Sequence, residues 1–445
     1  MSPLPLPLSQ LLSPRLTSLG RLEARADLQG FPNEAALDAG ASPWRLSLDG
    51  DWRFQLAPRP DSAPADWTSS STDKASWRDI KVPGVWTRQG TDDLPHYANW
   101  QMPFDCQKPP AVPNKNATGL YRSAIAVPEA WQGRSTILHI GGFESLVLVW
   151  CNQVFIGMAK DSRLPSEFDL TEALQPGENE LALMVVRWCD ATWIEDQDHW
   201  NHGGLHRSVW LESRGVTHLD DLVIDTDFDP ASKIGTASIR ASITGDSAGW
   251  SVRSQLQGPG NRAAIAEATA PVDQFDTSQS VGEQWAQSYS FKAYAASLEL
   301  DIPNAAPWSA EIPSRYRLIT ELLDPSGAVT EVYETWIGFT RIETAGRRLS
   351  VNGRPVVLIG VNRHDHHPEN GKTCSREDIR AELVTMKQHN INAIRTAHYP
   401  NDPALLDLAD ELGFYVIDEA NVECHARWSD RKSTRLNSSH LVNSY

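Results

Sequence analysis

The sequence has no long hydrophobic run. Its longest purely apolar stretches, such as Leu146 to Cys151, are far shorter than the roughly 20 residues that span a bilayer as a helix. The opening residues MSPLPLPLSQLL hold no Lys or Arg, and their prolines break the apolar helix that a secretory signal needs. We therefore expect a cytoplasmic protein with no membrane partner.

Cysteine is scarce, and the residues present are scattered. The five are Cys106, Cys151, Cys189, Cys374 and Cys424. Their odd number and the lack of Cys-x-x-Cys spacing favour reduced thiols over a disulfide framework.

Basic residues are outnumbered by acidic ones. The 445-residue chain has 57 Asp and Glu against 40 Lys and Arg, which gives a net charge of -17. The electrostatic field of this net negative charge repels phosphate backbones, so the composition excludes nucleic acid as a partner. Tryptophan, in contrast, is plentiful at 17 residues, and surplus Trp suits stacking on the apolar faces of sugar rings.

The length predicts roughly two to four domains. Residues 1–43, rich in Pro, Leu and Ser, form an N-terminal extension that we expect to wrap the first domain. Residues 44–217 contain short strands such as STILHI (135–140) and ELALMVVRW (180–188) between Pro and Gly turns, as is typical of an antiparallel β-sandwich. Residues 218–340 alternate apolar and polar side chains over roughly seven strands, the size of an immunoglobulin-like β-sandwich.

Beyond this point the pattern changes to alternating strands and helices. VVLIGV (356–361) is nearly all apolar, as a strand buried on both faces would be. INAIRTA (391–397) and FYVIDEA (414–420) are further buried strands, and a capping box at residues 375–378 begins the helix between the first two. This order predicts the opening of a parallel α/β unit, of which a barrel is one of the two main forms.

Polar residues gather directly after each of these three predicted strands. Residues 362–367 (NRHDHH) follow the first, His398 and Tyr399 follow the second, and residues 418–425 (DEANVECH) follow the third. In (β/α)₈ enzymes the active site is built at the carboxyl ends of the strands. One His near a strand end is more often structural, but three clusters on one edge predict a functional site.

Two of these residues have the spacing of metal ligands. Glu423 and His425 are separated by one residue, so in an extended segment both side chains point to the same side. A carboxylate with one imidazole suits Mg²⁺ or Mn²⁺. His364, His366 and His367 leave zinc open as an alternative, although the surrounding residues favour a loop over the strand that would align them.

Four long motifs carry a specific resemblance. They are WIEDQDHWNHGGLHRSVWL (193–211), GVNRHDHHP (360–368), NAIRTAHYPNDP (392–403) and GFYVIDEANVECH (413–425). Together they closely resemble the family 2 glycoside hydrolases, and in particular the large bacterial β-galactosidases. The resemblance implies a multidomain β plus α/β fold: a sugar-binding jelly-roll β-sandwich (44–217), the immunoglobulin-like β-sandwich (218–340) and the first three strands of an incomplete (β/α)₈ TIM-barrel catalytic domain (341–426).

The resemblance also implies an activity and its sugar-binding residues. The activity is the retaining hydrolysis of terminal β-D-galactose from β-galactosides such as lactose, by a homo-oligomeric enzyme. His364 and His398 match histidines that bind galactose hydroxyls and stabilise the transition state. Asp198 matches a carboxylate that contacts the 6-hydroxyl, and Asn99 matches an asparagine that reaches the sugar from the first domain.

The family pattern implies two metal cofactors. Glu423 and His425 match two ligands of a magnesium ion, and Asp198 matches a ligand of a sodium ion. Asp418 and Glu419, which precede this pair, equally suit a structural role in which they hold the barrel mouth together by hydrogen bonds.

The sequence departs from the family near its end. A retaining glycosidase needs two carboxylates about 5 to 5.5 Å apart, and in the family these lie on the fourth and seventh barrel strands, which this chain does not reach. We therefore expect the 445-residue chain to be inactive alone. Residues 427–445 are rich in Ser, Thr, Asn and Arg without a period, and we predict that they are a non-native tail.

Two other functions fit parts of the same sequence. The first is a β-glucuronidase or β-mannosidase of the same family, but a glucuronidase should supply cationic partners for a uronate, and the EDQD and HDHH runs favour galactose. The second is a non-catalytic carbohydrate-binding protein made of the two sandwiches. A binding module has no use for barrel strands, which favours the enzyme.

Overall fold

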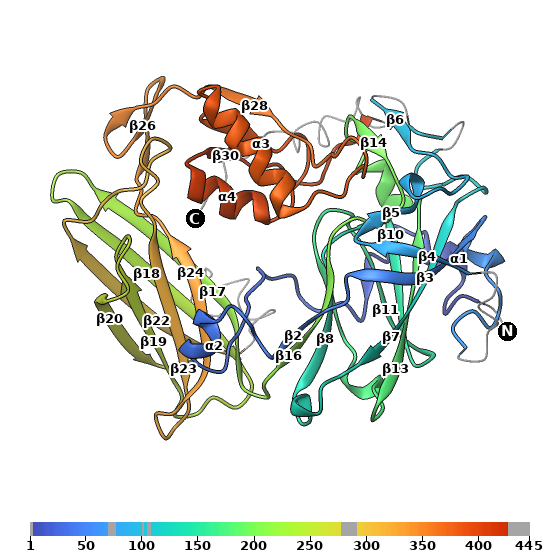
Figure 1. Cartoon of the computed structure of the whole chain (residues 1–445), viewed down its shortest axis with the longest axis horizontal. Coiled ribbons are helices and arrows are strands. Elements are labelled where there is room, and N and C mark those ends of the chain that lie inside the picture. The colour runs from blue at the N-terminus through green and yellow to red at the C-terminus, as the bar shows by residue number, and fades with distance from the viewer. Residues whose placement is uncertain (1–2, 70–76, 100–101, 105–107, 277–291, 426–445) are drawn as a thin grey trace.

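The computed structural model describes residues 3–69, 77–99, 102–104, 108–276 and 292–425. Two β-sandwiches stand side by side, and the last part of the described chain lies across one end of both (Figure 1). The predicted tail and Cys106 fall outside the described residues, and Cys151, Cys189 and Cys374 carry free thiols. Among the described helices, none combines the length and the apolar composition needed to cross a membrane.

The first sandwich is the predicted jelly roll. One sheet has the order β1-β11-β10-β13-β7-β3-β4, with bounds Ser18–Leu19, Val154–Lys160, Leu146–Cys151, Glu178–Val186, Thr118–Ala126, Gly50–Ala57 and Arg78–Val82. The other has the order β12-β8-β16-β2, with bounds Ser166–Asp169, Ser135–Ile140, Val209–Arg214 and Arg45–Ser47. Every residue of β10 is buried, because the sandwich core lies on one face of this strand and a second apolar cluster lies on the other. Short 3₁₀ turns connect the strands at Pro60–Ser62, Trp86–Arg88, Glu129–Trp131, Thr171–Ala173 and Asp190–Trp193.

Two small sheets close the end of the jelly roll that faces the barrel strands. The two-stranded ribbon joins β6 (His96–Ala98) to β14 (His199–Asn201). The three-stranded sheet has the order β5-β15-β9, with bounds Gly84–Val85, Gly204–Leu205 and Phe143–Glu144. Figure 1 shows β6 and β14 next to each other on this side of the molecule.

The second sandwich has the predicted immunoglobulin-like size. One sheet is β17-β18-β22-β21, with bounds His218–Asp229, Ile234–Thr244, Lys292–Pro303 and Asp273–Asp276. The other is β20-β19-β23-β24, with bounds Ala264–Pro271, Ser251–Gln257, Tyr316–Leu323 and Val329–Ile337. The alternation predicted for β18 is confirmed, because Ala237, Ile239, Ala241 and Ile243 all lie in the core.

The last unit contains the three predicted parallel strands. After a small sheet of β25 (Ile342–Ala345), β26 (Arg348–Val351) and β27 (Arg354–Pro355), the parallel order is β28-β29-β30, with bounds Gly360–Asn362, Ala393–Arg395 and Tyr415–Ile417. Helices α3 (Arg376–Gln388) and α4 (Ala404–Leu412) connect them. The capping box is confirmed, since Ser375 accepts a hydrogen bond from the Asp378 backbone and Asp378 reaches back to Ser375. The described strands form an open sheet, as the start of a barrel would.

One predicted strand is wrong in extent and burial. Strand β28 covers only Gly360–Asn362, while Val357, Leu358 and Ile359 before it are 76%, 38% and 54% exposed. Apolar composition predicts burial only if partner strands cover both edges and both faces. In the described sheet β28 pairs with β29 alone, so its other edge stays open.

The N-terminal extension contacts both sandwiches, which is more than we expected. It contains α1 (Leu8–Leu11), strand β1 and α2 (Glu34–Asp38). Leu11 packs in a jelly-roll cluster, whereas Phe31 packs against Val332 of the second sandwich. The extension therefore ties the two sandwiches together.

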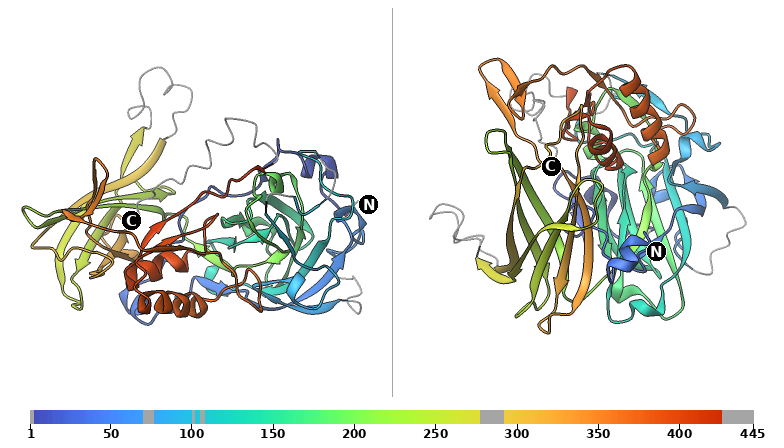
Figure 2. Two further views of the ribbon diagram at one scale, coloured as in Figure 1. Left: turned by 90° about the horizontal axis from the view of Figure 1, so that it is seen from above. Right: turned by 60° about the vertical axis from the view of Figure 1, so that its left-hand side comes forward.

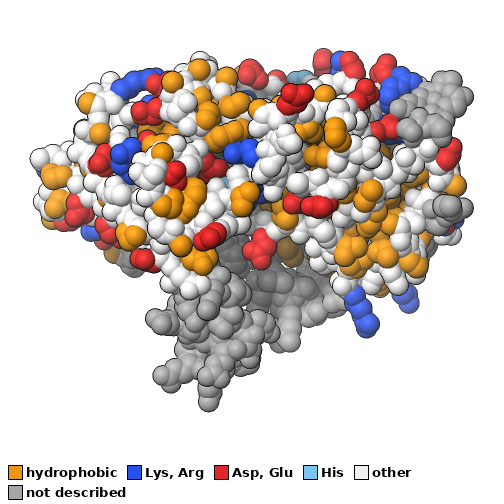
Figure 3. Space-filling view, turned by 90° about the horizontal axis from the view of Figure 1, so that it is seen from below, with side chains coloured by type: hydrophobic (Ala, Val, Ile, Leu, Met, Phe, Trp, Pro, Cys, Tyr) orange, Lys and Arg blue, Asp and Glu red, His pale blue; other side chains and the backbone are white. Residues whose placement is uncertain are grey.

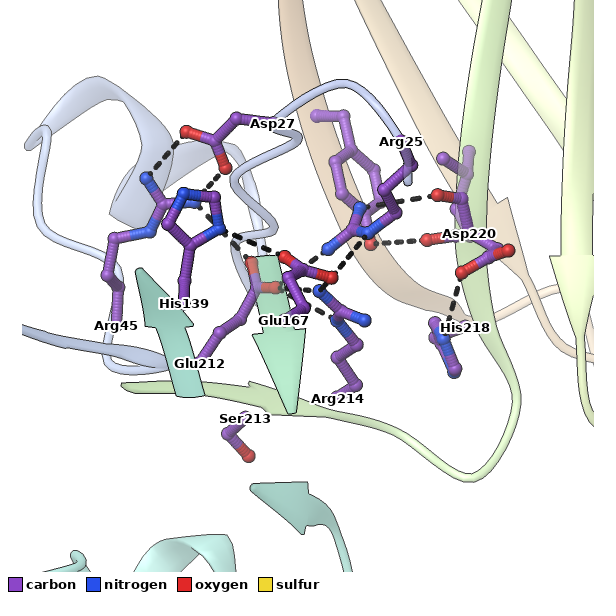
Figure 4. A network of polar contacts seen from close by, with 12 residues as sticks. Arg25, Asp27, Arg45, His139, Glu167, Glu212, Ser213, Arg214, His218 and Asp220 are labelled. Atoms are coloured by element: carbon purple, nitrogen blue, oxygen red, sulfur yellow. Dashed lines mark hydrogen bonds and ion pairs between the residues drawn. The ribbon is translucent and has the colours of Figure 1, made fainter. Parts of the chain in front are cut away.

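An ion-pair network reinforces this junction (Figure 4). The Arg25 guanidinium of the extension lies 2.8 Å from Glu212 and 3.3 Å from Glu167, both on jelly-roll strands. It also donates a hydrogen bond of 3.2 Å to the carbonyl oxygen of Asp220 at the start of the second sandwich. Arg214 pairs with both glutamates, at 2.6 and 2.8 Å. Buried carboxylates are tolerated here because each one has cationic partners.

Seen from above, the barrel strands and their helices lie between the two sandwiches (Figure 2). They contact both, because Trp308 of the second sandwich donates to the Asp410 carbonyl oxygen at 2.9 Å and Arg207 of the jelly roll pairs with Asp365 at 3.1 Å. On the face shown in Figure 3, acidic and basic side chains are interspersed, and hydrophobic side chains occur in small groups. The site described next lies on the opposite side, where the barrel strands approach the jelly roll.

Candidate active site

The segment after β30 is joined to a loop of the jelly roll. The Glu423 N–H donates to the Ile194 carbonyl oxygen at 2.7 Å, and the Asp196 N–H donates to the Glu423 carbonyl oxygen at 3.1 Å. The side chain of Asn421 accepts from Gln197 at 2.9 Å. The carboxyl end of the third barrel strand is thereby fixed against the jelly roll, and residues from both domains share one site.

The two predicted sugar-binding histidines meet at the carboxyl ends of β28 and β29. The ring centroids of His364 and His398 are 5.7 Å apart, with the rings nearly perpendicular. Burial, and then the neighbouring His398, lower the pKa of His364 to about 4, so its ring is neutral near pH 7. Its Nδ1 is shielded from solvent and finds no hydrogen-bond partner among the described residues. An orphaned ring nitrogen of this kind is able to bind a hydroxyl group.

The two predicted jelly-roll residues lie side by side at the end of the β6–β14 ribbon. Ala98 pairs with His199 in the last register position, and Asn99 and Asp198 are the next residues on the two strands. One carboxylate oxygen of Asp198, Oδ1, is shielded from solvent and accepts no hydrogen bond from the described groups. A buried carboxylate oxygen without a donor fits a cation or a sugar hydroxyl.

Electrostatics connect these residues to Glu423. Burial raises the pKa of the Glu423 carboxyl, the nearby His398 and His425 lower it, and the charge of Asp198 raises it further. The backbone bonds that join Glu423 to residues 194 and 196 also place it beside the loop that leads to Asp198. The structure thus brings together five predicted site residues, His364, His398, Asp198, Glu423 and His425, with Asn99 beside them.

Glu423 and His425 fit two positions in the coordination shell of a hard cation. Their Oε1 and Nε2 atoms are 3.5 Å apart. His425 Nδ1 lies 3.0 Å from the carbonyl oxygen of Asp196, which can only accept, so Nδ1 donates to this oxygen and Nε2 is the ring nitrogen that faces Glu423. Within the described ranges no three His, Cys, Asp or Glu side chains are placed to hold a metal ion.

Asp418 and Glu419 organise the strand ends. Thr396 donates its hydroxyl to Asp418 at 2.7 Å, and the Glu419 backbone donates to that same hydroxyl at 3.1 Å. Glu419 accepts from Arg395 at 2.5 Å and faces Nδ1 of His398 at 3.3 Å. These bonds orient His398 and favour the structural role for both acids.

A buried charge cluster beneath the site was not predicted from the sequence. Glu144 of β9 accepts from Arg163 at 2.9 Å and pairs with Lys372 of the loop after β28. Despite burial, Lys372 and Arg163 hold the pKa of Glu144 well below its ordinary value. The Arg163 guanidinium stacks 4.6 Å from the Tyr399 ring. The only sequence signal is a lone Glu two residues before the start of the all-apolar β10.

Asp365 is a second link between the domains. Its carboxylate accepts from Arg363 at 2.5 Å, from Arg207 of the jelly roll at 3.1 Å and from the Asp402 backbone at 2.7 Å. These cations lower the pKa of Asp365 against the opposing effect of burial. Asp365 therefore positions the loop that carries His364, and the zinc alternative finds no cluster of ligands in the described loop.

Relatives with similar sequences are beta-galactosidases by name. The chain is 36% identical over 408 residues to the beta-galactosidase of Psychromonas ingrahamii. The aligned region is 92% of this chain and 38% of the relative. It is 39% identical over 420 residues to a beta-galactosidase of Enterobacter cloacae, covering 93% of this chain and 39% of the relative. The chain thus spans well under half the length of the curated relatives it matches.

Solved structures share the fold at lower identity. A Bifidobacterium dentium beta-glucuronidase complexed with coumarin-3-O-glucuronide superposes with a TM-score of 0.71 at 21% identity, over 86% of this chain and 62% of the other. A Bacteroides uniformis beta-glucuronidase gives a TM-score of 0.68 at 21% identity, over 85% and 42%.

Three family models match consecutive parts of the chain. The sugar binding domain of glycosyl hydrolases family 2 matches residues 46–214, the family 2 domain that follows matches residues 217–339, and the family 2 TIM barrel domain matches residues 342–444. The order of these matches is the order of the jelly roll, the immunoglobulin-like sandwich and the barrel strands in the structure. This chain belongs to glycosyl hydrolases family 2.

Proposed function

We propose that the chain forms the sugar-binding part of a β-galactosidase, which hydrolyses terminal β-D-galactose residues of β-galactosides such as lactose with retention of configuration. The observation that carries this proposal is the meeting of His364 and His398 with Asp198 and Glu423 where the barrel strands approach the jelly roll. Hydroxyl-rich neutral sugars are bound by many hydrogen bonds, and those that strengthen as the oxocarbenium ion forms also lower the barrier. The beta-galactosidase relatives support the same substrate.

The charges around the site favour galactose over a uronic acid. Asp198 and Glu423 are carboxylates, and the nearby cation Arg395 is already paired with Glu419. A uronate would meet the negative charge of these carboxylates without a free cationic partner among these groups. This argument disfavours β-glucuronidase, while β-mannosidase differs by a hydroxyl configuration that only a substrate comparison separates.

Cleavage needs a suitable pair of carboxylates in the site. A retaining mechanism requires an acid/base and a nucleophile about 5 to 5.5 Å apart. Asp418 accepts a hydrogen bond from Thr396, and Glu419 accepts one from Arg395. Glu423 is the proposed metal ligand. We therefore propose that the 445-residue chain binds a galactoside without hydrolysing it.

Two metal ions belong to the same proposal. Glu423 and His425 would hold Mg²⁺, which supplies positive charge near the reacting centre, and the unpartnered oxygen of Asp198 would help to hold Na⁺ beside the sugar. We also propose that the enzyme is a cytoplasmic homo-oligomer.

Comparative binding tests the proposal. Methyl β-D-galactoside, methyl β-D-glucuronide and methyl β-D-mannoside are titrated into the purified chain, and hydrolysis of a chromogenic β-galactoside is followed in parallel. We expect the galactoside to bind most tightly and no hydrolysis above a mock preparation. If the glucuronide or the mannoside bound more tightly, that sugar and not galactose would be the substrate. Hydrolysis of the chromogenic β-galactoside would refute the inactivity of the chain.

A further inference from the structure

The β6–β14 ribbon carries an exposed aromatic pair. Tyr97 of β6 and Trp200 of β14 are directly opposite each other in the register. Their ring centroids are 5.5 Å apart at an interplanar angle of 61°. Tyr97 is 58% exposed and Trp200 is 43% exposed.

The two faces of this ribbon differ sharply. Ala98 and His199, the next opposed pair, are 7% and 5% exposed and belong to the interior of the domain. Tyr97 and Trp200 therefore project from the side that faces away from the core. Two large rings held in contact on a solvent-exposed surface keep much apolar area in water, which is a feature of ligand-binding surfaces.

The aromatic pair is continuous with the candidate active site. Asn99 and Asp198 are the next positions beyond the Ala98–His199 pair at the end of the same ribbon, and the loop that leads to Asp198 is bonded to Glu423 through Asp196. A ligand that contacts Asp198 at one end needs to extend by only about two residues of strand, roughly 7 Å, to reach the rings. This is about the length of one pyranose ring.

We propose that Tyr97 and Trp200 form a stacking platform for the second sugar of a disaccharide galactoside, the pyranose that becomes the leaving group. The C–H groups on one face of a pyranose pack on an aromatic ring, while its hydroxyls stay in water at the edges. The neighbouring carboxylates Asp198 and Glu423 disfavour an anionic occupant. This inference rests on the proposed function, because that function places the first sugar at His364, His398 and Asp198.

Saturation-transfer NMR on the 445-residue chain with lactose tests the platform. Lactose reports both subsites at once, since its galactose and glucose protons are resolved separately. The variants are Trp200→Ala and Tyr97→Ala. The matched control is Trp336→Ala, because Trp336 of the second sandwich is also 43% exposed. Circular dichroism and a thermal unfolding curve establish that each variant is folded, and two independent platform variants protect the test if one does not fold.

We expect wild-type chain to transfer saturation to both sugar rings. Either platform variant should weaken the glucose-ring signals by about threefold or more, in the range of a lost aromatic contact, and leave the galactose-ring signals in place. The control should leave both sets unchanged. Glucose-ring signals that are absent in wild type, unchanged in both platform variants, or equally weakened in the control would overturn the platform.

The same spectra separate this inference from the proposed function. Silent galactose protons together with glucose signals that depend on Trp200 would contradict the galactose site and support the platform. Strong galactose signals with silent glucose protons would support the galactose site and contradict the platform. Silence of both rings would contradict both.

Discussion

Asp196 donates its backbone N–H to the carbonyl oxygen of Glu423 at 3.1 Å. This bond joins a jelly-roll loop to the segment that follows the third barrel strand, although more than 200 residues of sequence separate them. The proposed metal ligands and Asp198 therefore share one rigid frame, and the site depends on how firmly the two domains are joined.

Asn421 should contribute to this junction. Its side chain accepts from Gln197 at 2.9 Å and donates to Asp161 at 3.1 Å. Asn421→Ala removes both bonds, and we expect a loss of about 1 to 2 kcal/mol in stability together with faster amide exchange at residues 421–425. Hydrogen-exchange mass spectrometry measures this. Asn261→Ala, in an exposed turn, is the control, and equal exchange in both variants would mean that Asn421 does not hold the segment.

Removing the buried charge of Glu144 should be far more damaging than removing an exposed one. Glu144→Gln leaves Arg163 and Lys372 buried without their shared anion, and we expect a loss of about 3 to 5 kcal/mol in the free energy of unfolding. Asp79→Asn breaks the exposed ion pair with Arg53, in which the Arg53 side chain is 37% exposed and the Asp79 side chain 64% exposed. This change should lower the free energy of unfolding by about 1 kcal/mol or less. Denaturant titration measures both, and similar losses would show that the buried pair has no special role.

The contribution of His202 to the free energy of unfolding should become unfavourable in mild acid. Burial lowers the pKa of His202 to about 3, below its unfolded value of about 6.5. Between these pH values the unfolded chain binds a proton that the folded chain does not, so the free energy of unfolding decreases as the pH falls. From pH 7 to pH 5 this loss is about 2 kcal/mol.

A difference measurement isolates this effect. Burial raises the pKa of Glu195 to about 7, so Glu195 acts in the opposite sense: the folded state gains stability as the pH falls from about 7 toward the unfolded value of about 4.3. Comparing wild type with His202→Asn at both pH values cancels this contribution. The variant should lose less stability than wild type over the interval, and identical pH dependence would contradict the assignment.

Magnesium binding should depend on the charge of Glu423. In a chain extended to the length of its beta-galactosidase relatives, Glu423→Gln removes a negative ligand that a hard cation prefers. We expect the Mg²⁺ dissociation constant to rise by about tenfold or more. Calorimetric titration tests this, with Glu369→Gln in the same domain as the control. Superimposable titration curves for wild type and Glu423→Gln would assign the pair a structural role.

Short-range patterns predicted much of the fold. The capping box at Ser375 and the alternation in β18 depend on residues within a few positions of each other, and both are confirmed. The predicted burial of Val357 to Ile359 was wrong, because the burial of these apolar residues depends on strands elsewhere in the chain.

The candidate site also shows the difference between features set by short-range patterns and features set by contacts between distant residues. The clusters after the barrel strands were predicted because parallel strands bring their carboxyl ends to one edge. The pairing of Glu144 with Lys372 spans 228 residues, and no local pattern signals it. The aromatic pair on the β6–β14 ribbon was equally hidden, because its exposure becomes visible only in the folded chain.

The most direct test of the account is the affinity of the His398→Phe variant for methyl β-D-galactoside, compared with wild-type chain. Phe keeps most of the shape of the ring and loses both nitrogens, so a packing role would survive the change. We expect the dissociation constant to rise by about tenfold, as for a lost hydrogen bond to the sugar, and in the extended enzyme kcat/KM should fall by about 100-fold or more. An unchanged dissociation constant in a folded variant would contradict the central claim that this edge of the barrel strands binds the sugar.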